Sequence, residues 1–173
     1  LIIDCTLGGG GHTQAILKRI QPQGKLLGID LDPLAIAAAS KATQNLKGLV
    51  LVRDNFKNLK NIAENHNFNK VNGILLDLGL SSGQLQDQKR GFSFLAQGSL
   101  DMRFGNQTEI TAQEILSSYS QKDLTEIFRK YGEEKLAGLI SKRIIEVRQQ
   151  SPITSPNQLV DIVTDVYKNQ YRG

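Results

Sequence analysis

The sequence contains no tryptophan, one methionine, one cysteine and four prolines among its 173 residues. A single cysteine, Cys5, excludes a disulfide within the chain, which fits a reducing, cytoplasmic compartment (bacterial, or an organelle stroma or matrix). No apolar run approaches the roughly 20 residues needed to cross a bilayer, and no signal peptide is visible. One cysteine and two histidines are too few for a structural zinc site. We therefore expect neither a membrane nor a metal partner.

A large net charge is also missing. The formal net charge is +4 and the sequence pI is about 9.2, with no run of basic residues at either end. This balance permits a nucleic-acid partner, whose contacts would have to come from a folded surface. The chain begins without methionine inside the apolar run Leu1–Ile3. We therefore expect a piece of a longer protein.

Short aliphatic runs alternate with helical patterns in the first part of the chain. Four such runs, bounded by Gly, Asn or Asp, predict buried strands at Leu1–Cys5, Lys25–Asp30, Leu49–Arg53 and Val71–Leu78. Helices are expected near Thr13–Ile20 and from Pro33 onward. Strands that alternate with helices pair in parallel, so the pattern predicts a doubly wound α/β sheet.

The pattern changes after the fourth predicted strand. Residues 79–107 are rich in Gly, Ser, Gln and Asp, and a loop of this length usually has a function. Beyond it the pattern is helical, with helix starts at Thr111, Ser120 and Ser155. Five apolar residues recur on one predicted helix face: Leu136, Leu139, Ile140, Ile144 and Val147. We expect one domain over residues 1–107 and a helical insertion over residues 108–173.

Four consecutive glycines, Gly8–Gly11, stand between the first predicted strand and its helix. Glycines let ligand atoms approach the backbone, and the N–H groups of a helix start favour an anion. The dinucleotide fingerprint is incomplete because Thr13 replaces its third glycine, and the Lys-Ser/Thr pair of a phosphate loop is missing. The remaining pattern, Asp-x-x-x-Gly-x-Gly, is typical of S-adenosylmethionine-dependent methyltransferases, in which the helix start faces an amino-acid carboxylate.

The next two predicted strands end in residues that suit a nucleoside. Asp30 follows Gly8 by 22 residues, where a carboxylate is expected to accept both ribose hydroxyls. The alternative is that Asp30 and Asp32 only cap the following helix. Phe56 offers an apolar face for an adenine ring, with a polar neighbour for the ring edge, although Phe56 could also be an ordinary core residue.

Four sequence blocks carry a resemblance to a known family. In chain order they are DCTLGGGGHT, GIDLDPLAI, ILLDLGLSS and the pair RGFSF and LDMR. Together they resemble the MraW/RsmH-type methyltransferases, which modify N4 of a cytidine in the decoding region of small-subunit (16S) ribosomal RNA. The resemblance covers essentially the whole chain, and the RGFSF–LDMR pair is much more specific than the glycine loop.

The resemblance implies a Rossmann-like class I methyltransferase sheet with an inserted helical, RNA-recognising module, completed by strands after the insertion. It also implies S-adenosyl-L-methionine as cofactor and 16S ribosomal RNA within the small subunit as partner. The residues expected to bind the cofactor come from the glycine loop and the strand ends: Gly8, Gly10, Gly11, His12, Asp30, Phe56, Asp77 and Gln84.

Methyl transfer to an exocyclic amine requires alignment of the reactants and no covalent intermediate, and such alignment can lower the barrier by about 7–11 kcal/mol. Asp77 is the candidate for gripping the amine, and Ser81 and Ser82 are further catalytic candidates. A base inside RNA has to swing out to reach the site. The residues expected to meet RNA are aromatic or basic: Arg90, Phe92, Phe94 and Arg103.

Other interpretations remain open at this point. Gly83, Gln86 and Gly105 depart from the family pattern, which has a proline and two acidic residues there. These departures leave the cofactor site intact but keep open the alternative of a non-catalytic relative that binds cofactor or RNA. A dinucleotide-dependent (NAD) oxidoreductase would share the fold, but the missing third glycine disfavours it. Cys5 as a catalytic nucleophile is also disfavoured, because a cysteine at the end of a buried strand is usually inert.

Overall fold

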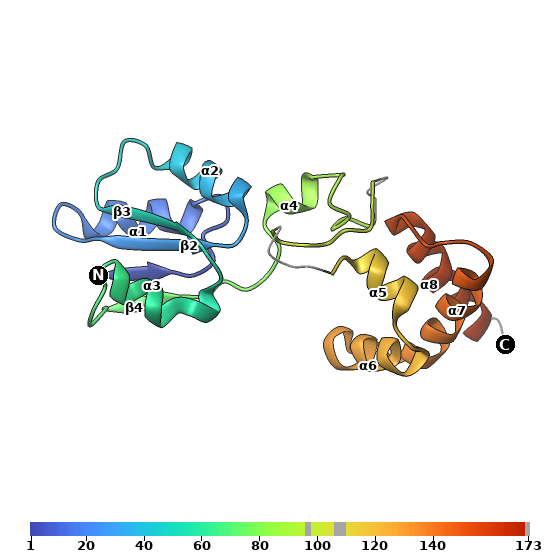
Figure 1. Cartoon of the computed structure of the whole chain (residues 1–173). Coiled ribbons are helices and arrows are strands. Elements are labelled where there is room, and N and C mark those ends of the chain that lie inside the picture. Colours follow the sequence, from blue (N-terminus) through green and yellow to red (C-terminus); the bar gives the residue numbers. More distant parts are fainter. Residues whose placement is uncertain (96–97, 106–109, 172–173) are drawn as a thin grey trace. The chain divides into compact units, whose positions relative to one another are not determined.

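The computed structural model describes residues 1–95, 98–105 and 110–171. The chain forms two compact units, Leu1–Gly83 and Gln84–Gly173, and each is described by itself (Figure 1). The first unit holds the strands and the second holds most of the helices. None of the helices in the described part of the chain is long and apolar enough to cross a bilayer.

The first unit contains a parallel sheet of four strands in the order β3-β2-β1-β4. The strands are β1 (Ile2–Asp4), β2 (Leu26–Asp30), β3 (Leu49–Arg53) and β4 (Gly73–Leu75). Ile3 pairs with Leu27 of β2 and with Ile74 of β4. This confirms the predicted α/β class and the partial Rossmann-like sheet, although β4 is shorter than the run Val71–Leu78 predicted for it.

Helices connect the strands on both faces of this sheet (Figure 1). They are α1 (Gly11–Ile20), α2 (Pro33–Ala42), the short 3-10 helix η1 (Phe56–Asn58) and α3 (Leu59–Asn65). Because parallel crossovers are right-handed, the steps from β1 to β2 to β3 place α1 and α2 on one face. The return from β3 to β4 places α3 on the other face, where Ile62 packs with Ile3 and Leu27.

The second unit has a hydrophobic core of its own. Its helices are α5 (Ala112–Ser118), α6 (Gln121–Gly132), α7 (Ala137–Gln150) and α8 (Pro156–Gln170), and the short α4 (Ser82–Gln86) crosses the unit boundary. The predicted helix starts are confirmed, because the side chains of Thr111, Ser120 and Ser155 each accept a hydrogen bond from the first turn. The buried core residues come from four helices and two loops: Leu100, Leu116, Leu124, Ile140, Ile144, Ile153, Ile162 and Val166.

The two units divide after Gly83, whereas the sequence predicts a domain boundary after residue 107. The difference arises because part of the long loop packs with the helices. Leu100 is buried in the helical core, and its N–H donates to the carbonyl of Thr154 at 3.1 Å. Its own carbonyl accepts from the N–H of Gln113 at 2.8 Å. The loop around Leu100 is therefore a structural part of the helical unit.

The sequence prediction for the apolar face of α7 is wrong at one residue, Leu139. Ile140 and Ile144 are buried in the core and Leu136 and Val147 pack against it, but Leu139 is 45% exposed. The buried stripe is narrower than the sequence pattern suggests, because Leu139 lies at its margin on the solvent side.

This difference allows a matched test of the core. Ile144→Ala, at a fully buried position, should lower the free energy of unfolding by about 2–5 kcal/mol, because it removes buried methyl groups and leaves a cavity. Leu139→Ala on the same helix should lower the free energy of unfolding by less than about 1 kcal/mol. Urea unfolding of both variants measures this, and equal losses would contradict the assigned burial.

Candidate active site

Aspartates lie at the carboxyl ends of all four strands. Asp4 ends β1 and Asp30 ends β2, while Asp54 directly follows β3 and Asp77 lies two residues after β4. The strands are parallel, so these ends meet at one edge of the sheet, with neighbouring strands about 4.8 Å apart. The predicted site residues of the first unit therefore gather around a row of carboxylates, which we call the carboxyl edge.

The glycine loop opens onto this edge. Gly8 (φ +50°) and Gly10 (φ +81°) have left-handed backbone conformations, and a Cβ on Gly10 would lie 3.0 Å from the backbone of Ala39 in α2. Gly9 and Gly11 have no such constraint, because a Cβ on either would meet no protein atom within 4 Å. Two of the four glycines are thus explained by the fold, and the other two leave open space beside the backbone.

Helix α1 begins at this loop without a side-chain cap. Its N-cap is Gly10, which has no side chain, and its first turn carries no acidic residue. The N–H groups of the first turn of a helix have no partner inside the helix, and they carry the positive end of its dipole. The start of α1 therefore suits an anionic group such as a carboxylate.

Asp30 holds the glycine loop in place. Its Oδ2 accepts from the N–H of Gly8 at 2.9 Å, and its Oδ1 accepts from the N–H of Asp32 at 2.9 Å. An ionised carboxylate has about four acceptor sites, so Asp30 retains capacity for ligand hydroxyls. Asp32 is different: it is the N-cap of α2, and its Oδ1 accepts from Leu34 at 3.0 Å. The helix-cap interpretation is confirmed for Asp32.

The carboxylate of Asp4 is completely buried beneath the loop. Its Oδ2 accepts from the hydroxyl of Thr13 at 2.7 Å, and its Oδ1 accepts from the N–H of Thr6 at 3.2 Å. The hydroxyl oxygen of Thr6 in turn accepts from the N–H of Asp77 at 2.7 Å. A continuous chain of hydrogen bonds therefore links α1, β1 and the segment after β4.

Asp77 and His12 face each other across the open side of the loop. His12 Nδ1 lies 3.7 Å from Asp77 Oδ2, and the two side chains are 59% and 65% exposed. The separation is longer than a hydrogen bond, so the contact is an ion pair only when the imidazole is protonated. Both groups are accessible to a ligand.

The remaining predicted residues of the first unit lie around the same edge. Phe56 in η1 is 43% exposed, so its ring is not an ordinary core side chain. Asp54 Oδ1 accepts from the N–H of Asn55 and from the side-chain amide of Asn58, at 2.6 and 2.9 Å. Ser81 lies beside the loop, because a Cβ on Gly8 would be 3.8 Å from its Cβ. Ser82 is exposed at the start of α4.

The other predicted residues belong to the second unit. Gln84 is buried in α4. Arg90 Nη2 donates to the carbonyls of Arg103 and Phe104 at 2.7 and 2.9 Å, and its guanidinium lies 5.3 Å from the centre of the Phe92 ring. That ring also packs against Phe104, with centroids 5.2 Å apart. Arg90 and Phe92 thus stabilise the loop itself.

Arg103 and Phe94 differ in their environments. Arg103 Nε and Nη2 donate to Oδ1 and Oδ2 of Asp101, each at 2.7 Å. This guanidinium holds the pKa of the Asp101 carboxyl below its usual range. Phe94 is 70% exposed, so its ring is available for stacking.

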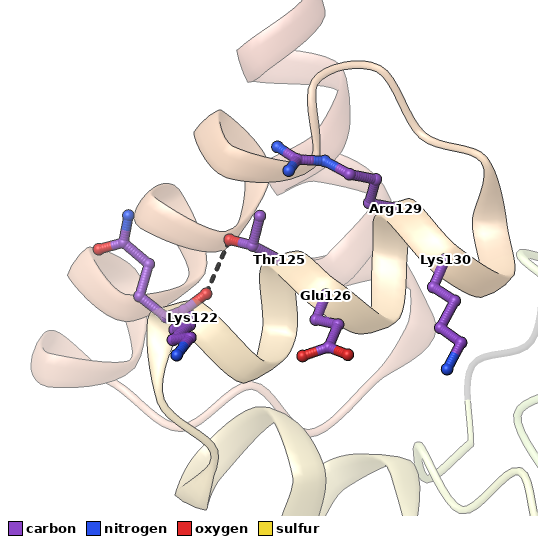
Figure 2. Close-up of a pocket in the computed structure, with 6 residues that line it drawn as sticks. Lys122, Thr125, Glu126, Arg129 and Lys130 are labelled. Carbon is purple, nitrogen blue, oxygen red and sulfur yellow. Dashed lines mark hydrogen bonds between the residues drawn. The ribbon is translucent and has the colours of Figure 1, made fainter.

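Two further features of the described residues are not assigned to the candidate site: the thiol of Cys5 and a pocket on α6. Burial, and secondarily the charge of Asp4, raise the pKa of the Cys5 thiol above its usual range, so it is a poor nucleophile. A pocket of about 720 Å³ lies on α6 in the second unit (Figure 2). It is lined only by residues of that helix, with charges of both signs: Gln121, Lys122, Thr125, Glu126, Arg129 and Lys130.

Sequence reasoning missed the buried network beneath the loop. The roles of Thr6 and Thr13 were not predicted, because each depends on a contact that only the folded chain creates. A signal was present in the sequence: Asp4 and Thr6 are polar residues next to an apolar strand, and buried polar side chains need hydrogen-bond partners.

Comparison with known proteins gives a consistent result. A family model described as the MraW methylase family matches residues 1–173. Three curated relatives share the name Ribosomal RNA small subunit methyltransferase H. The relative from Clostridium botulinum (strain Loch Maree) is 42% identical over 93% of this chain and 52% of its own length. The relative from Desulfosudis oleivorans is 43% identical over 99% of this chain and 55% of its own length. The relative from Halothermothrix orenii is 44% identical over 95% of this chain and 53% of its own length. The chain thus spans about half the length of the curated relatives it matches.

The buried pair of Asp4 and Thr13 gives a test of the site's foundation. Thr13→Val removes the hydroxyl and leaves a buried oxygen of the Asp4 carboxylate without its donor. The free energy of unfolding should fall by about 1–3 kcal/mol or more. Thr13→Ser keeps the hydroxyl and loses one methyl group, which should cost about 1 kcal/mol. Denaturant unfolding compares the two variants, and a valine variant as stable as the serine variant would show that the hydrogen bond is unimportant.

Proposed function

The chain belongs to the MraW methylase family, and from that membership we propose that it transfers a methyl group from S-adenosyl-L-methionine to N4 of a cytidine in small-subunit (16S) ribosomal RNA. The observation that supports this most is the open glycine loop beside a row of four aspartates. A cofactor with a net positive charge suits this edge, whereas a dinucleotide pyrophosphate would meet like charge. The name shared by the curated relatives supports ribosomal RNA as the substrate.

The described residues fit each part of the cofactor. The uncapped start of α1, at Gly11 and His12, suits the amino-acid carboxylate. The remaining acceptor sites of Asp30 suit the ribose hydroxyls, and the exposed ring of Phe56 suits the adenine. Gly8 and Gly10 give the loop the shape that leaves this space open. We propose that Asp77 and Gln84 complete the binding site.

The bound cofactor supplies an activated methyl group on a sulfonium. The protein has to hold the cytosine amine in line with that group, because the nitrogen lone pair is delocalised into the ring. We assign this role to the Asp77 carboxylate, which is exposed and whose backbone is fixed by Thr6. As the bond from the nitrogen to the methyl carbon formed, the bond from that carbon to the sulfonium sulfur would break, and its electron pair would go to the sulfur, which leaves as a neutral thioether. The amine would also lose one proton, which Asp77 could accept and pass to water. Ser81 and Ser82 are additional hydrogen-bonding groups for the base.

The second unit is proposed to recognise the RNA. Phe94 offers the most exposed ring of its segment for stacking on an extruded base. Arg90, Phe92 and Arg103 act mainly by shaping this segment, because their guanidinium and ring contacts are already made within the protein. Arg90 and Arg103 remain proposed phosphate contacts.

A substitution of Asp30 tests the ribose assignment. Asp30→Ala would remove the carboxylate proposed to accept from both ribose hydroxyls, together with its hydrogen bonds to the N–H groups of Gly8 and Asp32. It should therefore weaken S-adenosylmethionine binding about 100-fold or more. Glu64→Ala, which removes an exposed carboxylate from α3, should leave binding unchanged. Calorimetric titration measures both affinities. Near-normal affinity in the Asp30 variant would refute the ribose assignment.

The reaction itself is tested by labelled methyl transfer with the full-length protein. The acceptors are undermethylated small subunits, naked ribosomal RNA and tRNA, and the product nucleoside is identified by mass spectrometry. N4-methylcytidine in ribosomal RNA is the expected product. Cofactor binding without transfer to any acceptor would instead support the non-catalytic relative, for which Gly83, Gln86 and Gly105 are the departures from the family pattern.

A further inference from the structure

In the first unit, positive and negative side chains lie at opposite ends of the strands. Lys25 directly precedes β2, which ends in Asp30, and Lys47 stands two residues before β3, which Asp54 follows. The loops that precede these strands lie at the amino ends of the strands, opposite the carboxyl edge (Figure 1). Five residues of a strand span about 16 Å, which exceeds the screening length of about 10 Å at 0.1 M salt. The aspartates therefore do not cancel the field of the lysines.

Both crossover helices on one face add positive charge at the same end. Lys18 and Arg19 lie in the last turn of α1, and Lys41 lies in the last turn of α2. The full set, which we call the amino-edge surface, is Lys18, Arg19, Lys25, Lys41 and Lys47. All five are exposed, and within the described residues none of them forms an ion pair.

The backbone beneath this surface is firmly connected. The side-chain amide of Gln21 donates to the carbonyl of Lys47 at 3.1 Å, and the N–H of Leu26 donates to the carbonyl of Gly48 at 2.8 Å. The side-chain amide of Gln14 donates to the carbonyl of Ala42 at 2.8 Å, which joins α1 to the end of α2. The five cations therefore project from a backbone of fixed geometry.

Helix dipoles explain only part of this set. Cations in the last turn of a helix are stabilised by the negative end of the dipole, which accounts for Lys18, Arg19 and Lys41 without any partner. Lys25 and Lys47 lie outside the helices and gain nothing from this effect. On the opposite face of the sheet the charges are mixed. The last turn of α3 carries the acidic Glu64, and the loop that follows it carries the basic Lys70.

We propose that the amino-edge surface binds the phosphodiester backbone of ribosomal RNA at a point distant from the methylated nucleotide. This inference rests on the proposed function, which supplies a large folded RNA as substrate. Four of the five cations are lysines and none of the aromatic residues belongs to this surface, so it is suited to phosphate contacts and not to reading bases. Since it lies across the sheet from the carboxyl edge, one short RNA segment cannot occupy both.

The test compares two matched double variants of the full-length protein. Lys25→Gln with Lys47→Gln removes two lysines from the surface. The control, Lys57→Gln with Lys60→Gln, removes two exposed lysines from η1 and the start of α3, which follow the carboxyl end of β3. Affinity for whole small-subunit ribosomal RNA is measured between 50 and 200 mM salt. For the surface variant, the slope of log K against log salt should fall by about 1.4–1.8, and affinity at 0.1 M salt should fall about tenfold.

The control variant should keep the slope of the unmodified protein within about 0.5. A short RNA hairpin that carries only the target cytidine should bind both variants equally, because it cannot reach the amino-edge surface. Cofactor affinity and melting temperature should match the unmodified protein in both variants, which excludes damage to the fold or to the cofactor site.

Several outcomes would overturn the inference. They are an unchanged slope in the surface variant, equal losses in both variants, or a loss of hairpin binding that equals the loss for whole RNA. Binding of polyglutamate through Lys25 and Lys47 with an unchanged RNA slope would show that the partner is an acidic protein. Failure of the unmodified protein to methylate RNA would refute the proposed function. The slope comparison would still show whether the amino-edge surface binds RNA phosphates.

Discussion

The candidate site depends on one buried carboxylate. Asp4 is fully buried, and within the described part of the chain no basic side chain pairs with it; its partners are Thr6 on one side of the glycine loop and Thr13 on the other. A buried charge is tolerated only when its hydrogen bonds are made, so the protein stabilises a single arrangement of both loop ends. Through Thr6 the same arrangement fixes the backbone of Asp77. Asp4 thus connects the two ends of the glycine loop with the segment that carries Asp77.

Much of the fold follows from local pattern. Aliphatic runs bounded by Gly, Asn and Asp predict the strands, and their alternation with helices predicts parallel pairing, as found in β1 to β4. Helix starts at Thr111, Ser120 and Ser155 are predictable because a capping side chain acts within its own first turn. Asp30 is predictable for a related reason, since strand ends and loop spacing place it next to Gly8.

Features that depend on tertiary contacts were not predictable. Arg90 and Arg103 look like free cations in the sequence, but one holds backbone carbonyls and the other holds Asp101. Leu139 has the right helical spacing for burial, and only the packing of the neighbouring helices leaves it exposed. The loop around Leu100 carries no periodic pattern, yet its backbone hydrogen bonds make it part of the helical unit.

The row of aspartates would also restrict how a nucleotide of the proposed RNA substrate enters the site. A nucleobase is neutral at physiological pH, whereas each phosphate of an RNA chain carries a negative charge. The carboxylates of Asp30, Asp54 and Asp77 would therefore oppose the sugar–phosphate chain and leave the base as the part that can approach. For the proposed substrate, the carboxyl edge would thus select the orientation in which the base enters first. The phosphates of that nucleotide would then need positive groups elsewhere on the protein.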